Sequence, residues 1–267
     1  MIKIFMKIFI INSIQPHLIL NSLLILLKMK NLYILLFIIA YNCYSQNITR
    51  INYITVPAGG TLENNEQILK SKIAKYFVGV DEALKKLNYE LLISDKKSYY
   101  HVISVLDFSE KAARLARAFS SASDFYTNKE KNNYIKVIEF SGEKFNVLYN
   151  INSNWELTKE SKIISGYTCF KATQDRKLRL KKIDNIVKVI AWYCPSIPLS
   201  YGPKEFGGLP GLILELQDDK IVHIANKIEF KTNSKLKEFN GKIISEEEFD
   251  KIYDDTMLKT FDGMSIK

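Results

Sequence analysis

Few residues of this 267-residue chain have the types and spacing that a reaction needs. His101 and His223 lie in segments that alternate like strands, and neither has a second histidine or a cysteine at the spacing of a zinc site. No Gly-x-Ser-x-Gly elbow marks a hydrolase nucleophile. We therefore expect a non-enzymatic protein without a cofactor or metal. A hydrolase without a recognisable motif is an alternative, because paired carboxylates leave little trace in one sequence.

The pair Cys169 and Cys194 is the second candidate for chemistry in the sequence. They flank a predicted hairpin whose tip lies near Lys181 and Lys182. If the two strands pair about that midpoint, the two cysteines face each other at a separation that a disulfide spans. A slip of one residue would place them on opposite faces of the sheet. A disulfide and two separate thiols are both open, and a redox-active role is disfavoured.

Residues 205–216 form the most informative stretch, although they contain no arrangement of catalytic groups. Gly207 and Gly208 allow positive φ, Pro210 fixes one φ, and Gly211 lets the backbone pass close to a neighbour before an aliphatic strand. The loop before that strand is stiff and aromatic, with Trp192, Tyr193, Tyr201, Phe206, Leu209, Pro195, Pro198 and Pro203 in or beside it. Such a loop either plugs one end of a curved sheet or frames a binding groove, and the plug is favoured.

The elements that would position this loop alternate between strand and helix patterns. Helices are predicted over 61–88, with a break near Gly79, over 108–121, and from a capping box at Ser245 to about Phe261. The predicted strands are 47–56, 89–94, 98–107, 134–140, 145–151, 155–164, 166–173, 186–193, 212–216 and 221–230. This order predicts an α+β fold: a curved antiparallel β-sheet with helices packed on its concave side or at its ends. The nearest architecture, by analogy, is the LolA-like half-barrel of periplasmic lipoprotein carriers.

Residues 1–45 differ from the rest of the chain. They hold four lysines, no acidic residue and three apolar blocks. The last block has a basic start at Met29 and Lys30, an apolar centre and a small residue at Ser45, which is the layout of a signal peptide. We expect Met29 to be the true start and cleavage to follow Ser45. An uncleaved membrane anchor is the alternative, and lipid modification of Cys43 is disfavoured.

Residues 46–267 are long enough for a single domain with its own core. The net charge falls from +9 to +5 when the four leader lysines are removed. The remaining lysines are spread along the chain, and an export signal argues against nucleic acid as a partner. Contact with a membrane is expected only through the leader.

A composite motif in the second half resembles the GLPGLI family, whose hexapeptide occurs intact at 208–213. The residues that carry the resemblance are Cys169, Trp192, Tyr193, Gly202, Pro203, Phe206, Gly208, Leu209, Pro210, Gly211, Leu212 and Ile213. Members of that family are exported proteins of Gram-negative bacteria, mostly of unknown function, and some are encoded near TonB-dependent outer-membrane receptors. The resemblance implies export and a β-rich domain, but no catalytic residue. Cys194 stands where many members have a hydroxyl residue, which argues against a family-wide disulfide.

These patterns together predict an exported periplasmic or cell-envelope protein that binds a partner or a hydrophobic ligand. The alternative is an accessory interaction subunit of a TonB-dependent outer-membrane transport system, with an outer-membrane receptor as its partner.

Overall fold

The computed structural model describes residues 24–30, 48–59, 77–103, 111–180 and 183–264. The chain divides into two compact units, Met1–Gln46 and Asn47–Lys267. In the first unit, residues 24–30 are helical. Among the described helices, none combines the length and the apolar character that crossing a membrane requires.

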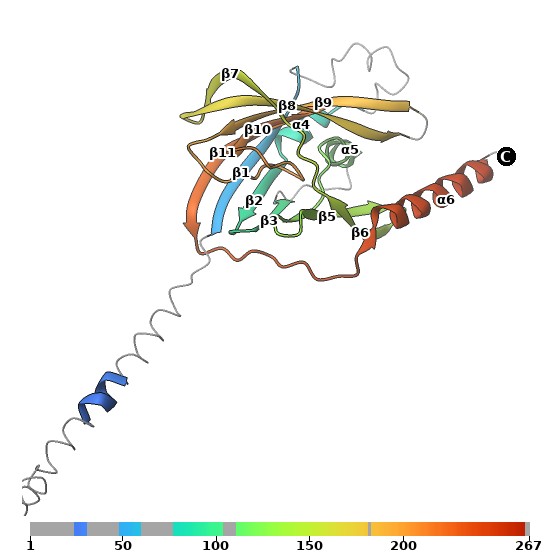
Figure 1. Cartoon of the computed structure of the whole chain (residues 1–267). Helices are drawn as coiled ribbons and strands as arrows, with labels where there is room; N and C mark the ends of the chain where they lie inside the picture. The colour runs from blue at the N-terminus through green and yellow to red at the C-terminus, as the bar shows by residue number, and fades with distance from the viewer. Residues whose placement is uncertain (1–23, 31–47, 60–76, 104–110, 181–182, 265–267) are drawn as a thin grey trace, which may run out of the picture. The chain divides into compact units, whose positions relative to one another are not determined.

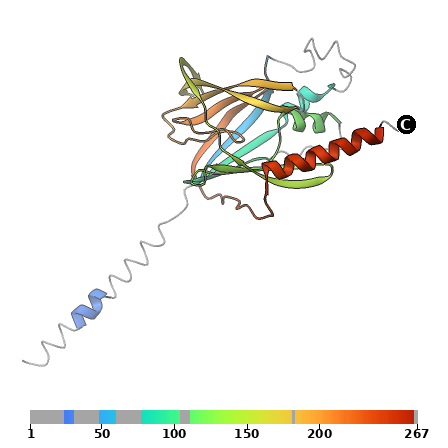
Figure 2. The same ribbon diagram turned by 45° about the vertical axis from the view of Figure 1, so that its right-hand side comes forward.

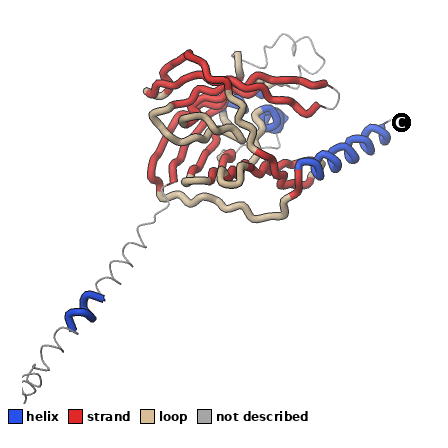
Figure 3. The backbone as a smooth tube through the Cα atoms, in the orientation of Figure 1, coloured by secondary structure: helices blue, strands red, loops and turns tan. Residues whose placement is uncertain are grey.

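The second unit holds one 12-stranded sheet in the order β12-β6-β5-β4-β3-β2-β1-β11-β10-β9-β8-β7 (Figures 1 and 3). All neighbours pair antiparallel except β12, which runs parallel to β6, so the sheet is mixed and open. The strands are β1 (Ile48–Pro57), β2 (Asn88–Ile93), β3 (Lys97–Val102), β4 (Phe125–Asn128), β5 (Asn133–Phe140), β6 (Glu143–Asn150), β7 (Glu156–Ile164), β8 (Tyr167–Leu180), β9 (Ile183–Cys194), β10 (Leu212–Asp218), β11 (Ile221–Thr232) and β12 (Ile244–Ser245). The expected antiparallel sheet is confirmed apart from this parallel edge. The strands do not form one continuous meander, because β7 forms one edge of the sheet whereas β6 lies beside β12 at the other, and β1 pairs with β11.

Local turn chemistry explains why two of the hairpins could be predicted from the sequence. Ser141 and Gly142 join β5 to β6, with φ of 54° and 85°. Ser165 and Gly166 join β7 to β8, with φ of 49° and 83°. Positive φ at both central residues gives a turn whose twist matches that of the flanking strands. The two strands that the sequence did not predict, β4 and β12, have four and two residues, too few to show a period.

Three described helices accompany the sheet: α4 (Val80–Lys85), α5 (Lys111–Phe119) and α6 (Glu246–Met264). Gly79, at φ 80°, begins α4, so the predicted break lies where the sequence placed it. The predicted helical residues before it, 61–76, lie outside the described residues. At the start of α6, the Glu248 backbone N–H donates to Ser245 Oγ at 3.1 Å, which confirms the predicted cap.

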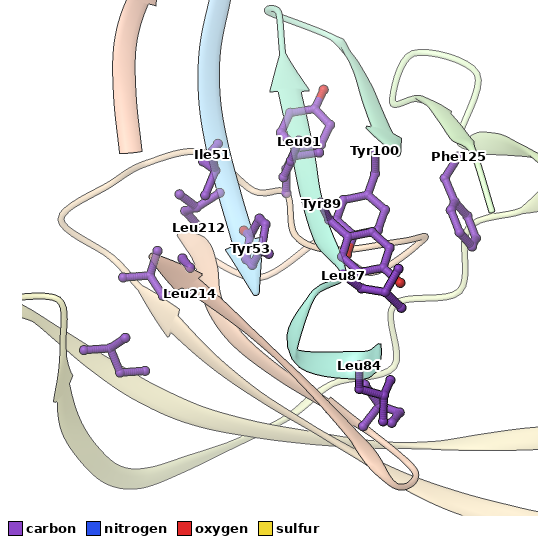
Figure 4. Close-up of a cluster of buried hydrophobic side chains, with 14 of the residues drawn as sticks. Ile51, Tyr53, Leu84, Leu87, Tyr89, Leu91, Tyr100, Phe125, Leu212 and Leu214 are labelled. Atoms are coloured by element: carbon purple, nitrogen blue, oxygen red, sulfur yellow. The ribbon is translucent and has the colours of Figure 1, made fainter. Parts of the chain in front are cut away.

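The sheet bends, and α4 and α5 lie on the inner side of the bend (Figures 1 and 2). The main core fills this space with side chains from β1, β2, β3, β10 and α4, among them Tyr53, Leu84, Tyr89, Tyr100 and Leu214 (Figure 4). The sheet is open at β7 and β12. The half-barrel class and the LolA analogy stay predictions.

The buried tyrosines keep their hydroxyl groups hydrogen-bonded, as buried polar groups must. Tyr89 donates to Ser120 Oγ at 2.7 Å, and the Tyr100 hydroxyl lies 2.9 Å from His223 Nδ1. Burial raises the pKa of Tyr89 to about 12. Burial, reinforced by the Lys204 charge, holds the pKa of His223 well below its ordinary value. His223 is therefore a neutral member of the core at physiological pH.

Candidate functional site

The loop between β9 and β10, residues 195–211, folds back on itself and is fastened at both ends. Ser200 Oγ donates to the Leu209 carbonyl at 2.7 Å, and the Gly208 N–H donates to the Ser200 carbonyl at 3.2 Å. Tyr201 and Gly207 form an isolated bridge across the loop. These bonds satisfy the backbone of a segment that lies against the folded interior. We call residues 195–211 the signature loop.

Gly211 stands where the signature loop meets the end of β9. A Cβ at Gly211 would lie 2.2 Å from the Cys194 carbonyl oxygen, a separation that real Cβ atoms do not reach. The φ of Gly208 is 84°, and a Cβ there would meet Ser153 at 2.6 Å. The hexapeptide therefore needs glycine for close approach of two backbones and for a left-handed turn.

The side chains of the signature loop are divided between core and surface. Phe206, Leu209 and Ile213 pack into one buried cluster with Tyr193. The other residues predicted from the motif differ in burial. Trp192 is half-buried, and Gly208 and Pro210 are exposed. The buried ones are Gly202, Pro203, Gly211 and Leu212. The loop thus plugs this part of the sheet, and Phe206 also borders a cavity described below.

A register shift in the β9–β10 pairing lies between Ile213 and Glu215. Ile213 there makes two hydrogen bonds to other parts of the fold: its carbonyl accepts from the Tyr53 hydroxyl at 2.7 Å, and its N–H donates to the Tyr201 carbonyl at 2.9 Å. The irregularity joins the signature loop to the centre of the sheet.

The β8–β9 register places Cys169 opposite Cys194, as the hairpin midpoint predicts. Both side chains are buried and both are free thiols in this structure. Burial, followed by the neighbouring Cys194, raises the pKa of the Cys169 thiol to about 12. The Cys169 sulfur is therefore not poised as a nucleophile.

We expect both thiols to resist alkylation in the native protein, because a reagent attacks the thiolate and needs access to it. In a Cys43→Ser background, mass spectrometry after iodoacetamide should show no label at Cys169 or Cys194 until guanidinium unfolds the chain. Rapid labelling of the native protein would contradict the burial. Labelling after unfolding with and without a reductant also decides between two thiols and a disulfide.

A buried ion cluster connects the signature loop to β8 and β10. Lys204 Nζ lies 2.8 Å from Asp218 Oδ2, and the two side chains are 2% and 4% exposed. Arg176 donates to Asp218 Oδ1 through Nε at 3.0 Å and also through Nη2. Burial acts to raise the pKa of the Asp218 carboxyl, but the Lys204 and Arg176 charges and hydrogen bonds outweigh it and lower that pKa. Asp218 is the charged centre of the cluster.

A cavity of about 390 Å³ lies beside this cluster. It is lined by amides, charged groups and two aromatic rings, namely Tyr134, Asn150, Asn152, Asn154, Gln174, Asp175, Arg176, Lys177, Ile186, Glu205 and Phe206. We call it the loop pocket. Glu205 Oε2 is buried and has no hydrogen-bond partner among the described residues. A buried carboxylate oxygen without a donor costs free energy, which marks the place where a bound molecule would supply one.

Lys136 of β5 adds a further charge to this neighbourhood. Burial lowers the pKa of its ammonium, the Glu205 carboxylate acts to raise it, and the Lys204 and Arg176 charges lower it further. The interior therefore holds charges of both signs close together, in the part of the sheet where the sequence reading expected aromatic rings.

The sequence reading did not single out Arg176, Lys204, Glu205, Asp218 or Lys136. Lys204 and Glu205 lie between Pro203 and Phe206, inside the recognised motif. The one sequence signal for a charged site was this pair of charged residues within an otherwise apolar, turn-forming segment. Arg176 and Asp218 looked like solvated strand and turn residues. His101 and His223 lie in β3 and β11, and the described residues contain no group of three ligands suited to a metal ion.

The fold and the site define an open mixed-sheet protein with a polar pocket beside a buried glycine-proline loop. Residues 173–215 match a family described as a protein of unknown function (Porph_ging), over β8, β9, the signature loop and the start of β10. This match overlaps the stretch that resembles the GLPGLI family.

Two solved structures are similar to the chain. "Structure of PNGF-II in P21 space group" is 13% identical with a TM-score of 0.46, and covers 77% of this chain and 32% of that one. "Structure of PNGF-II in C2 space group" is 13% identical with a TM-score of 0.43, and covers 75% and 31%. The chain spans about a third of the length of these structures. No curated protein matches it.

Proposed function

We propose that this protein is an exported, non-enzymatic binding protein of the periplasm or cell envelope, and that the loop pocket holds a polar small molecule. The observation that carries the proposal is Glu205, a lining residue of a cavity of about 390 Å³ whose Oε2 is buried and has no hydrogen-bond partner among the described residues. Ligand pockets combine an apolar frame with a few placed polar groups, and cavities of this volume are typical of them.

The lining favours a polar ligand over the hydrophobic one expected from the sequence. Asn150, Asn152, Asn154 and Gln174 in the cavity lining offer amide donors and acceptors. Phe206 is only 5% exposed, so it offers little open apolar surface.

The Glu205→Gln variant tests the proposal, because a binding role and a structural role predict opposite results. Gln removes the negative charge that a bound donor would meet, so native mass spectrometry of the purified protein should show that the bound molecule is lost. Glu143→Gln, at the exposed first residue of β6, is the matched control and should retain it.

A lowered melting temperature with an unchanged bound molecule would overturn the binding role of Glu205.

The alternative proposal is an accessory role in TonB-dependent transport through β7, the edge strand with one unpaired side, on which Ile163 is 75% exposed. Co-purification with an outer-membrane receptor after crosslinking would support that alternative.

A further inference from the structure

A strap of residues 233–243 leads from β11 to β12 along one side of the sheet (Figures 1 and 3). Side chains hold it in place: Leu236 packs on the cluster of Ile48, Leu92 and Tyr99, and the Phe239 ring meets Tyr126 edge-on at 5.3 Å. No backbone–backbone hydrogen bond joins residues 234–242 to a described strand, although the Asn146 side chain of β6 donates to the Lys242 carbonyl at 2.9 Å. The strap can therefore shift without breaking a β-ladder.

A second cavity, of about 350 Å³, lies between the strap and strands β3 to β6. We call it the strap pocket. It shares no lining residue with the loop pocket. Its apolar lining comes from both sides, with Tyr126, Ile135 and Leu148 from the strands and Leu236, Phe239 and Ile243 from the strap. This lining could remove a hydrocarbon chain from water.

Three lysines from separate segments line the same cavity: Lys97, Lys131 and Lys237. The single acidic residue in the lining, Glu238, is 85% exposed and lies 4.0 Å from Lys97 Nζ. Lys237 Nζ lies 4.0 Å from Asp124. Among the described residues, no acidic group lies within ion-pair distance of Lys131 Nζ. The strap pocket therefore has an excess of positive charge.

We infer that the strap pocket binds a single-chain anionic amphiphile, a long-chain carboxylate. The apolar walls would take the chain, and the three ammonium groups would meet the carboxylate through charge-assisted hydrogen bonds. The volume lies at the low end of ligand cavities, which suits one chain and not two. Lysines are compact point charges and do not form the paired fork by which arginine grips phosphate. The inference rests on the strap pocket alone and is independent of the proposed function.

Titration calorimetry with dodecanoate and dodecyltrimethylammonium tests the inference, because these two amphiphiles share a chain length and differ in head-group charge. Dodecanoate should bind, more weakly as salt is added, and dodecyltrimethylammonium should not. The double variant Lys97→Gln/Lys131→Gln should weaken dodecanoate binding about tenfold or more. Lys159→Gln, exposed on the edge strand β7, is the matched control and should bind like the parent.

Ile243→Asp supplies a second variant with little risk to folding, because Ile243 is 43% exposed. A carboxylate in this apolar lining would have to lose its water to contact the hydrocarbon chain, so it should abolish dodecanoate binding. Equal affinity of the parent protein for the two amphiphiles would overturn the inference. So would an unchanged affinity for dodecanoate in Lys97→Gln/Lys131→Gln or in Ile243→Asp. Loss of dodecanoate binding in Glu205→Gln would place the amphiphile in the loop pocket and would also overturn it.

Discussion

The Gly211→Ala variant is expected to be recovered largely unfolded. The new Cβ would lie 2.2 Å from the Cys194 carbonyl oxygen and 2.8 Å from the Pro195 nitrogen. Both neighbours are backbone atoms, so no side chain can rotate away to make room. The contact would force the signature loop off the end of β9, and with it the buried Leu209 and Leu212. We expect a loss of more than about 3 kcal/mol in the free energy of unfolding.

Gly142→Ala is the matched control, because Gly142 also has a positive φ but a Cβ there would meet nothing within 4 Å. Its cost should be limited to backbone strain, about 1 kcal/mol. Guanidinium unfolding followed by circular dichroism measures both variants. Equal losses in the two variants would show that φ, and not the approach of two backbones, requires glycine at position 211.

The Asp218→Asn variant is expected to cost about 3–5 kcal/mol at neutral pH, because it leaves Lys204 buried without a counter-charge. The Lys204 side chain is 2% exposed, so water cannot solvate its ammonium. Lys204 also has a φ of 57°, which a residue with a Cβ adopts at a cost. The ion pair offsets that cost, so its loss should loosen the loop beside Glu205.

The same variant should change the dependence of stability on pH. The pKa of Asp218 is lowered in the folded state from its ordinary value of 3.8. A carboxyl group of this kind contributes stability that is present above the unfolded-state pKa and is lost as the pH falls through the folded-state pKa. The parent should therefore lose stability below about pH 4, and Asp218→Asn should lack that part of the acid loss.

Asp175→Asn is the control for the ion cluster. Asp175 is 62% exposed and lies 3.8 Å from Lys188, so this surface pair should be worth less than about 1 kcal/mol. Thermal unfolding between pH 3 and pH 7 measures the three proteins. An Asp218→Asn variant as stable as Asp175→Asn would show that the cluster contributes nothing to the fold.

Local features of the sequence predicted most of the β-structure. The Ser-Gly pairs at 141–142 and 165–166 mark their turns in the sequence, because glycine adopts positive φ without cost. The approach of Cys169 to Cys194 was predictable because one hairpin sets the register, in which the adjacent Phe170 and Tyr193 are paired. Of the long helix predicted over 61–88, the structure describes only residues from Phe77 onward, where α4 begins after Gly79.

The charged interior was not predictable, because it joins residues from strands that become neighbours only in the folded sheet. Lys204 and Asp218 are 14 positions apart, and Arg176 and Asp218 are 42 apart. A charged residue in a half-polar strand is ordinarily solvated, so no local pattern indicated that these side chains point inward. The sheet is mixed because β12 pairs parallel with β6. That pairing joins a strand of two residues to one that is distant in the sequence, so it was not predictable either.

The sequence by itself determined the hairpin turns, most of the strand segments along the chain and the rigid glycine-proline bend, because each depends on the backbone preferences of a few adjacent residues. The tertiary structure alone decided which charges are buried, where the two cavities lie and what lines them. Burial and electrostatic pairing are properties of the assembled sheet, since water is excluded only after distant strands have packed together.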